Sequence, residues 1–388
     1  MIPYGRQTLD DDDVKSVVSV LNSDFLTQGK EVPNFEADIS EKVKSRYATA
    51  VNSATSALHI ACLALDLKSG DYLWTTPISF VASANCGVYC GARIDFVDID
   101  LKTFNISIPK LEAKLLKAKK DNCLPKILVV VHMAGTPCEM DRIKLLSDIY
   151  GFKIIEDASH AMGARYNNEL IGNCKYSNIC VFSLHPVKII TSAEGGIALT
   201  NDRKVHENLQ LLRSHGITRD KKFLTNKSKE NHYYEQVKLG FNYRLSDLHA
   251  ALGRSQLQKL DVFIEKRQII ATQYSKYLND LPLILPFQVP KSVSAFHLYV
   301  VLLSENYLAN SRDIIYNKLH KAGIGVNIHY IPIHTQPFYS RMGFAPESFP
   351  NSIEYYRRAI SLPIFPSLKL AEQNYIVETL TEIISSIK

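Results

Sequence analysis

The sequence of 388 residues contains no apolar run long enough to cross a bilayer, and its first residues lack the pattern of a secretory signal peptide. It also has no block of basic residues, since the formal net charge is only +6 and the Lys and Arg residues are spread along the chain. Nothing therefore indicates a membrane or a nucleic-acid partner, and we expect a cytoplasmic protein. An anionic small-molecule substrate is compatible with this charge.

Two common kinds of cofactor site also lack support. Cys86 and Cys90 lie four residues apart, but no second cysteine pair or histidine cluster completes a zinc site, so we expect no metal. No glycine-rich dinucleotide fingerprint follows the first expected strand, which disfavours a nicotinamide-binding fold.

The chain that remains is typical of a globular α/β protein, with 46% hydrophobic and 22% charged residues. Apolar runs of strand length alternate with helical segments from residue 48 to residue 200, which predicts a mostly parallel sheet with helices on both faces. The length favours two domains, which we place at residues 1–250 and 251–388, with the helical segment 247–279 as the bridge. In the smaller, α+β domain we expect strands at 296–303 and within 323–334.

Near the start, an amphipathic helix is predicted after the acidic residues 10–13, which favour a helix N-terminus. Its apolar residues Val14, Val17, Val18 and Leu21 recur at helical spacing, so we expect this face to dock on the protein.

The stretch 152–200 carries the chemistry. One apolar run ends in Glu156 and Asp157, and the next, at 179–184, ends in a turn that presents Lys188. Open α/β sheets bind ligands at strand ends, so the acid and the lysine are expected near one another. A lysine in a partly dry site can lose its proton and attack a carbonyl carbon, while an aspartate can pair with a protonated ring nitrogen. The pair meets the needs of pyridoxal phosphate, although each residue alone is more often an ordinary surface lysine or helix cap.

A possible phosphate site lies at 52–58, with the sequence NSATSAL. Small and hydroxyl residues at a helix N-terminus offer backbone N–H groups and the positive end of the helix dipole to a phosphate. The alternative is an ordinary Ser or Thr N-cap.

Three strings in this order, EDASH at 156–160, FSLHPVK at 182–188 and EGG at 194–196, resemble the DegT/DnrJ/EryC1/StrS sugar aminotransferases. The resemblance runs from Tyr4 to about Asn374. It implies the α/β architecture of fold type I pyridoxal-phosphate enzymes, with a mostly parallel seven-stranded sheet. It also implies a homodimer with shared active sites, L-glutamate as amino donor, Lys188 as the Schiff-base lysine and Asp157 as the partner of the ring nitrogen. Relatives that dehydrate their substrate carry His at the lysine position, so Lys188 favours transamination.

The resemblance also implies the other site residues. The cofactor would contact Ala54, Thr55, Phe80, Asp157, His160, Ser183, Lys188 and, from the partner subunit across the dimer interface, Asn242. The substrate would contact Tyr4, Asp24, Phe25, Leu26, Thr27, Ala54, Ser183, His185, Asn242, Asn327, Ile328, His329 and Tyr330. Arg244 is open between a phosphate contact and a structural ion pair, and His297 and His334 are expected to be structural.

The strings DFLTQGK, NSATSAL, TTPISFVAS, FSLHPVK and NIHYIPIH most resemble the subgroup acting in pseudaminic acid biosynthesis. That implies amination of C4 of UDP-2-acetamido-2,6-dideoxy-β-L-arabino-hex-4-ulose, giving UDP-4-amino-4,6-dideoxy-N-acetyl-β-L-altrosamine. The alternatives are a 4-amino-sugar enzyme of the legionaminic acid, perosamine or bacillosamine type. Two alternatives lie outside the aminotransferase class: a pyridoxal-phosphate dehydratase or cyclase, and a non-catalytic cofactor-binding regulator.

Overall fold

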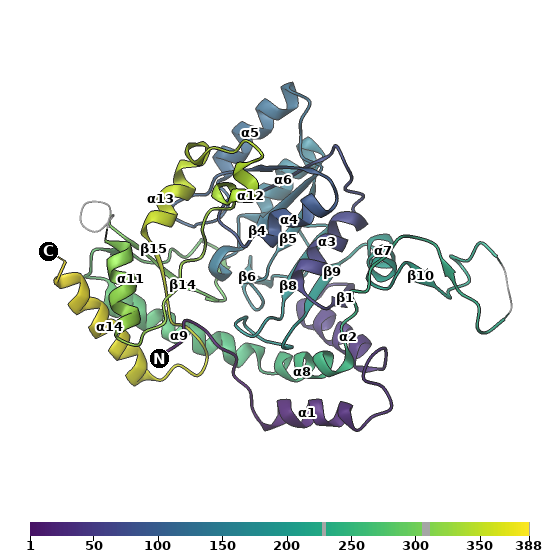
Figure 1. Ribbon diagram of the computed structural model, residues 1–388, viewed down its shortest axis with the longest axis horizontal. Helices are drawn as coiled ribbons and strands as arrows, with labels where there is room; N and C mark the ends of the chain where they lie inside the picture. Colours follow the sequence, from purple (N-terminus) through teal and green to yellow (C-terminus); the bar gives the residue numbers. More distant parts are fainter. Residues whose placement is uncertain (227–229, 305–310, 388) are drawn as a thin grey trace.

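The computed structural model describes residues 1–226, 230–304 and 311–387, and a seven-stranded sheet forms its centre (Figure 1). Strand β9 runs antiparallel to both of its neighbours, while the other pairings are parallel. The predicted mostly parallel sheet of an α/β protein is therefore confirmed. In spatial order the strands are β1 (Tyr47–Val51), β9 (Gly196–Thr200), β8 (Ile179–Ser183), β5 (Lys153–Asp157), β4 (Ile127–Val131), β2 (Tyr72–Thr75) and β3 (Arg93–Phe96).

Helices cover both faces of this sheet. Successive residues of its central strands point to opposite faces and are apolar, so both faces need to be covered. In β5, Ile154 packs into the core on one face and Ile155 into the core on the other. The Ile155 face is covered by α3 (Ala54–Ala64), α4 (Ala82–Tyr89) and α7 (Arg203–Arg213). The Ile154 face is covered by α2 (Glu31–Val43), α5 (Ile108–Lys120), α6 (Met140–Tyr150) and α8 (Asp247–Leu257).

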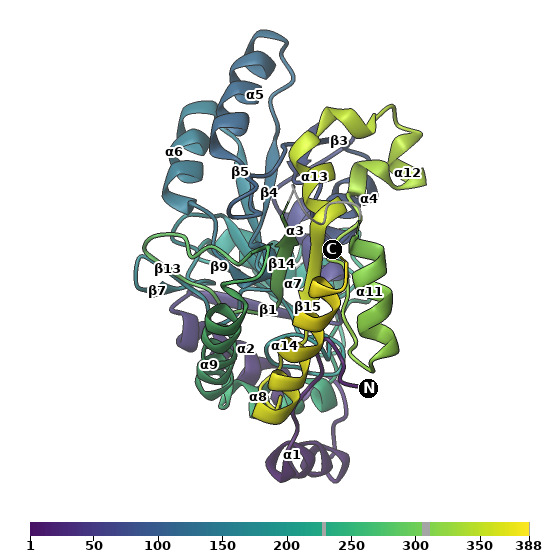
Figure 2. The same ribbon diagram turned by 90° about the vertical axis from the view of Figure 1, so that its left-hand side faces the viewer.

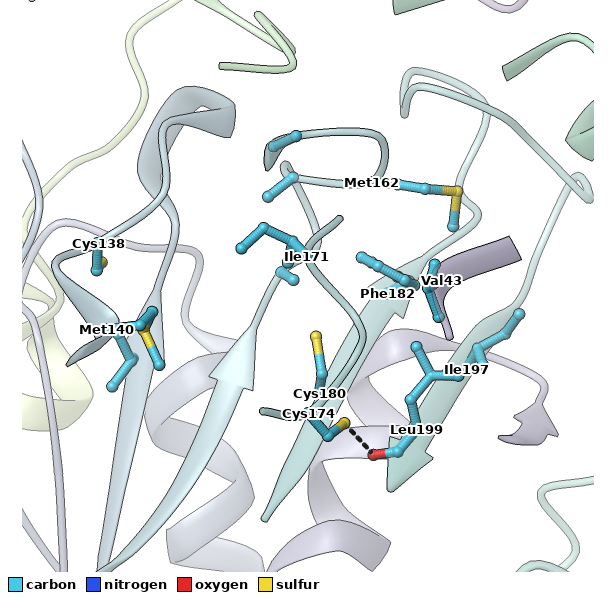
Figure 3. Packing of buried hydrophobic residues seen from close by; sticks show 14 of the residues in the cluster. Val43, Cys138, Met140, Met162, Ile171, Cys174, Cys180, Phe182, Ile197 and Leu199 are labelled. Atoms are coloured by element: carbon cyan, nitrogen blue, oxygen red, sulfur yellow. Dashed lines mark hydrogen bonds between the residues drawn. The ribbon is translucent and has the colours of Figure 1, made fainter. Parts of the chain in front are cut away.

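Figure 3 shows part of the core on the Ile154 face. Phe182 of β8 is fully buried among side chains that come from several elements, including Val43 at the end of α2. The thiol of Cys174 donates to the carbonyl oxygen of Leu199 at 3.2 Å, so this cysteine is reduced and paired with the backbone. Close packing here fixes the ends of β8 and β5, from which the chemically interesting side chains project.

A second, smaller region has its own sheet and core (Figure 2). Its antiparallel sheet has the order β12 (Leu283–Ile284), β14 (Tyr299–Leu303) and β15 (Ala359–Leu362). Helices α9 (Leu260–Leu278), α11 (Arg312–Lys321) and α14 (Leu370–Ser385) pack around it. The first turn of α9 contributes to the large core and its later turns to the small one, so this helix links the two. The boundary at residue 250 stays a prediction.

Several short elements complete the fold. Helix α1 (Asp11–Leu21) runs along α8, and the hairpin of β10 (Ile217–Thr218) and β11 (Glu235–Gln236) projects from the body (Figure 1). A small sheet joins β13 (Ser292–Val293), β6 (Arg165–Tyr166) and β7 (Glu169–Leu170). The remaining helical turns are η1 (Met133–Gly135), η2 (Ile333–Thr335), α12 (Pro337–Ser340), η3 (Pro346–Ser348) and α13 (Pro350–Arg358). Among the described residues, no helix has both the length and the apolar character needed to span a membrane.

The N-terminal helix forms as predicted, but the prediction of its docking face is wrong. The side chains of Val14, Val18 and Leu21 are exposed, whereas the carboxylate of Asp13 is buried. Asp13 accepts hydrogen bonds from Ser255 and Gln256, both at 2.7 Å. The side of the helix that carries Asp13 therefore packs on α8, where the buried carboxylate finds donors. Part of the apolar stripe is left exposed to solvent.

Two other expectations change in detail. The segment 323–334 is not a strand, because its backbone pairs only at isolated points: Ile324 with Ile2, and Asn327 with Ser361. The strand expected at 296–303 begins at Tyr299, after Phe296 in a left-handed conformation with φ of 44°. The helical segment 247–279 consists of α8 and α9, with a break between them.

Candidate active site

A cavity of about 390 Å³ lies at the carboxyl ends of β5 and β8, where the small region meets the large one. The residues singled out in the sequence that line it are Tyr4, Ala54, Thr55, Phe80, Asp157, His160, Ser183, His185, Lys188, Asn327, Ile328, His329 and Tyr330. The fold therefore brings together groups that come from both ends and the middle of the chain.

Lys188 follows β8 in a turn that is closed by its own backbone N–H, which donates to the carbonyl of His185 at 2.9 Å. Its side chain reaches into the cavity, where Nζ makes no hydrogen bond or ion pair with any residue that the structure describes. Burial lowers the pKa of this amine from 10.5 to about 8, although the negative charge of Asp157 acts in the opposite direction. An unpaired amine with a depressed pKa is suited to react with a carbonyl group.

Asp157 is the last residue of β5 and is buried, with 5% of its surface exposed. Its Oδ1 accepts from the hydroxyl of Ser159 at 2.6 Å and from the backbone N–H of the same residue at 3.2 Å. Its Oδ2 accepts from the hydroxyl of Ser83 at 2.6 Å, and Ser83 is in turn 2.6 Å from the hydroxyl of Ser79. These donors stabilise a buried carboxylate that has no cationic side chain in hydrogen-bonding contact among the residues that the structure describes.

The N-terminus of α3 forms another wall of the cavity, with Ala54 and Thr55 in its first turn. The hydroxyl of Ser53 caps the helix by accepting from the backbone N–H of Ser56 at 3.1 Å, so the N-cap is present, and the phosphate site at the same helix end stays a prediction. This wall lies against the start of β9: a Cβ at Gly196 would come within 2.4 Å of the Ser53 carbonyl carbon and oxygen. Only glycine permits this approach, so β9 packs directly against the backbone at the start of α3, which lines the cavity together with Ser183.

The opposite side of the cavity comes from the segment 327–330. The hydroxyl of Tyr330 lies 3.1 Å from Nε2 of His160, which links this segment to the end of β5. Nδ1 of His329 lies 2.8 Å from the hydroxyl of Ser361 on β15, and burial, together with the charge of Lys188, lowers its pKa to about 3. His329 is therefore a neutral imidazole, and the ring of Tyr4 packs against it at a tilt of 57°, with 5.2 Å between ring centroids.

The structure also shows which predicted residues stay apart from this cavity. The loop 24–27 is exposed, with Phe25 61% and Leu26 48% accessible, and it is held to the N-terminus of α8 through the carbonyl of Leu26. Asn242 is exposed beside α7, where it forms a single bridge with Ser214. The roles of Asp24, Phe25, Leu26, Thr27 and Asn242 stay predictions, because none of them lines the cavity of its own chain.

The residues left open or considered structural, Arg244, His297 and His334, do not line the cavity; His297 is buried against His160, with 4.3 Å between ring centroids. Arg244 donates to the hydroxyl of Ser214 at 3.1 Å and forms no ion pair with a described carboxylate. His334 lies 3.2 Å from the carbonyl oxygen of Pro346 and packs against Phe349, away from the cavity.

Sequence reasoning missed the three serines that surround Asp157. Ser79 and Ser83 lie four residues apart in TTPISFVAS, a spacing that puts two side chains on one side of a helical turn. Ser79 contacts Ser83, and the partner of Ser83, Asp157, lies 74 residues further along the chain, so no local pattern connects the two serines with it.

Comparisons with known proteins assign the chain to a family. Residues 7–381 match the family model described as the DegT/DnrJ/EryC1/StrS aminotransferase family. The chain is 37% identical to a Campylobacter jejuni protein named UDP-4-amino-4,6-dideoxy-N-acetyl-beta-L-altrosamine transaminase, over 100% of this chain and 99% of that one.

Solved structures are similar over the same length. PseC from Helicobacter pylori, an aminotransferase involved in the biosynthesis of pseudoaminic acid, superposes with a TM-score of 0.91 and 33% identity, over 99% of both chains. The putative sugar aminotransferase Spr1654 from Streptococcus pneumoniae, in a PMP-form, superposes with a TM-score of 0.90 and 25% identity over 100% of both chains. This chain belongs to the DegT/DnrJ/EryC1/StrS aminotransferase family.

Proposed function

We propose that this protein is a pyridoxal-phosphate-dependent aminotransferase that converts the 4-keto group of a nucleotide-linked sugar into an amine. The observation that carries the proposal is the amine of Lys188, which has a lowered pKa and no hydrogen-bonding partner among the described residues, in the cavity that also contains Asp157. Membership of an aminotransferase family supports the same reaction class.

The residues present fit this cofactor. The free amine of Lys188 would hold its aldehyde, the carboxylate of Asp157 would hold its ring nitrogen, and the exposed face of Phe80 would cover its ring. The first turn of α3 and Ser183, which both line the cavity, would hold its phosphate, because the N-terminus of a helix offers backbone N–H groups to an anion. When bound, pyridoxal phosphate supplies an aldehyde that takes up an amino group and a ring that withdraws electrons from the neighbouring carbon.

The chain's own groups would then perform proton transfer. Lys188 Nζ would take the proton from the α-carbon of the amino donor and return a proton in the second half-reaction. Because its pKa is about 8, roughly a tenth of this group would be free amine at pH 7, against far less for an ordinary lysine. Asp157 would keep a positive charge on the ring nitrogen, and the neutral rings of His160 and His329 would not compete with that charge.

For the substrate, we propose UDP-2-acetamido-2,6-dideoxy-β-L-arabino-hex-4-ulose, aminated at C4, with L-glutamate as donor. The names of the Campylobacter jejuni and Helicobacter pylori relatives support this choice over other 4-keto-sugars. The segment 327–330, with Tyr4 and His185, offers the hydroxyl, amide and imidazole groups that sugar recognition requires.

We further propose a homodimer in which the exposed loop 24–27 and Asn242 complete the site of the partner subunit. The exposure of Phe25 and Leu26, two large apolar side chains without cover in the single chain, supports an interface at this loop. Cross-linking from cysteines placed at 25 and analytical ultracentrifugation would test it.

The test of the function is spectroscopic. The protein loaded with pyridoxal phosphate is mixed with L-glutamate, and loss of its visible absorbance band is expected. Addition of a UDP-4-keto-sugar should restore the band, and NMR of the product, with a panel of UDP- and GDP-linked 4-keto-sugars, identifies the sugar. An unchanged band with every donor would refute the aminotransferase and leave a non-catalytic protein; consumption of the sugar without nitrogen incorporation would indicate a dehydratase.

A further inference from the structure

The hydrogen bonds around Asp157 leave little freedom in how they are directed. An ionised carboxylate only accepts, so the hydroxyls of Ser83 and Ser159 both donate to it, each at 2.6 Å. The single hydroxyl proton of Ser83 is thereby committed to Oδ2. Ser79, whose hydroxyl oxygen is 2.6 Å from that of Ser83, must then be the donor in their contact. The direction of the chain is Ser79 to Ser83 to Asp157.

The same hydrogen bonds show which oxygen of Asp157 can accept a further hydrogen bond from a ligand. Oδ1 has two donors, the hydroxyl and the backbone N–H of Ser159, which fill its two lone-pair directions. Oδ2 has one donor, Ser83, and therefore one open lone pair. Because Asp157 lines the cavity, the open position on Oδ2 is the one available to a donor that enters it.

A purely local role for these two serines is not supported by their contacts. Helix α4 begins at Ala82, and its N-cap residue Val81 makes no side-chain cap. The hydroxyl of Ser83 is directed to Asp157 and that of Ser79 to Ser83, rather than to the open N–H groups at the start of α4. Ser83 is fully buried, with 0% of its surface exposed, and Ser79 is 3% exposed where it lines the cavity.

We propose that Ser83, supported by Ser79, is a positioning residue that presents Oδ2 of Asp157 to the protonated ring nitrogen of the cofactor. The inference rests on the proposed function and deepens it. A donor on the same oxygen orients the carboxylate, so that the open lone pair of Oδ2 is held in one direction for the N–H of the ring. Ser79 strengthens this donor by polarising the hydroxyl of Ser83.

The experiment compares two ligands that differ only at the ring nitrogen. Cofactor-free enzyme is titrated with pyridoxal phosphate and with its 1-deaza analogue, which has a C–H group at that position, and the ratio of the two dissociation constants is measured. Ser83→Ala should reduce the preference for the nitrogen-containing ligand by about tenfold or more, the effect of one hydrogen bond to a charged group. Ser79→Ala should reduce it less, and Ser83→Thr, which keeps the hydroxyl, should restore it.

Controls separate this role from a structural one. Ser147→Ala removes a buried hydroxyl that donates to the carbonyl of Phe152 at 2.6 Å, away from the cavity, and should leave the ratio unchanged. If Ser83→Ala weakened both ligands equally, or changed neither, the positioning role would be wrong. If the unmodified protein bound neither ligand, the proposed function itself would fail before any variant was compared.

Discussion

The amine of Lys188 gives the most direct test of the site, because its properties follow from the environment alone. In the folded chain burial lowers its pKa from 10.5 to about 8. A shift of this size increases the fraction of free amine at neutral pH by roughly 300-fold, since each pH unit is a factor of ten. In cofactor-free protein, Lys188 should therefore react with an amine reagent much faster at pH 7 than the other lysines do.

Competitive labelling read by peptide mass spectrometry measures this. The rate of modification of Lys188 should reach half its maximum near pH 8. Lys175 is an internal reference, because its ion pair with Glu169 raises its pKa above the ordinary value and its labelling should rise only at higher pH. A midpoint for Lys188 near 10 would show that the amine is solvated, and the reasoning that makes it a nucleophile would be refuted.

The contribution of Asp157 can be separated with one variant. Its negative charge raises the pKa of Lys188, so Asp157→Asn should move the labelling midpoint below that of the unmodified protein. The lowered pKa of Lys188 also makes the stability of the fold depend on pH. Because the folded chain binds this proton less tightly than the unfolded chain, the free energy of unfolding should rise with pH between about 8 and 10.5, and Lys188→Met should remove this rise.

Three further predictions concern activity and stability. Lys188→Ala should retain the fold but lose turnover by about a thousandfold or more, because a general base and the covalent anchor are both lost, and a rate near normal would contradict its role. Gly196→Ala should weaken binding of pyridoxal phosphate and cost about 1–3 kcal/mol in urea denaturation, since the new Cβ would lie 2.4 Å from the backbone of Ser53, which has no room to move; unchanged affinity would argue against a phosphate site there. Arg267→Met should cost about 2–4 kcal/mol, because this buried guanidinium donates to three backbone carbonyls in the small region, and an unchanged unfolding midpoint would show that water replaces it.

Some of the local structure could be predicted from the sequence, because it depends only on the residues of one short segment. Apolar runs that end in Asp157 and in the turn before Lys188 are strands, and parallel strands end at the same edge of a sheet, so both side chains reach one cavity. The helix after residue 53 could be predicted in the same way, since Ser53 is an N-cap in both sequence and structure. Segments with one strong pattern are those for which the sequence is sufficient.

Other features depended on competition between interactions that only the folded chain brings together. The apolar stripe with Val14 and Val18 predicted the docking face of α1, yet Asp13 is buried instead because α8 supplies its donors. The segment 323–334 reads as a strand, but its neighbours on either side offer only single points of pairing.

The sequence by itself determined the α/β class and the sugar-aminotransferase resemblance, and it predicted Lys188 and Asp157 as the reactive groups, because each depends on residue types and their order. The tertiary structure alone decided how Asp157 is held, by Ser83 from α4 and by Ser159, and which residues of the small region close the cavity. Hydrogen bonds between residues far apart in the chain depend on how helices and strands pack, and that packing is a property of the whole core rather than of any segment.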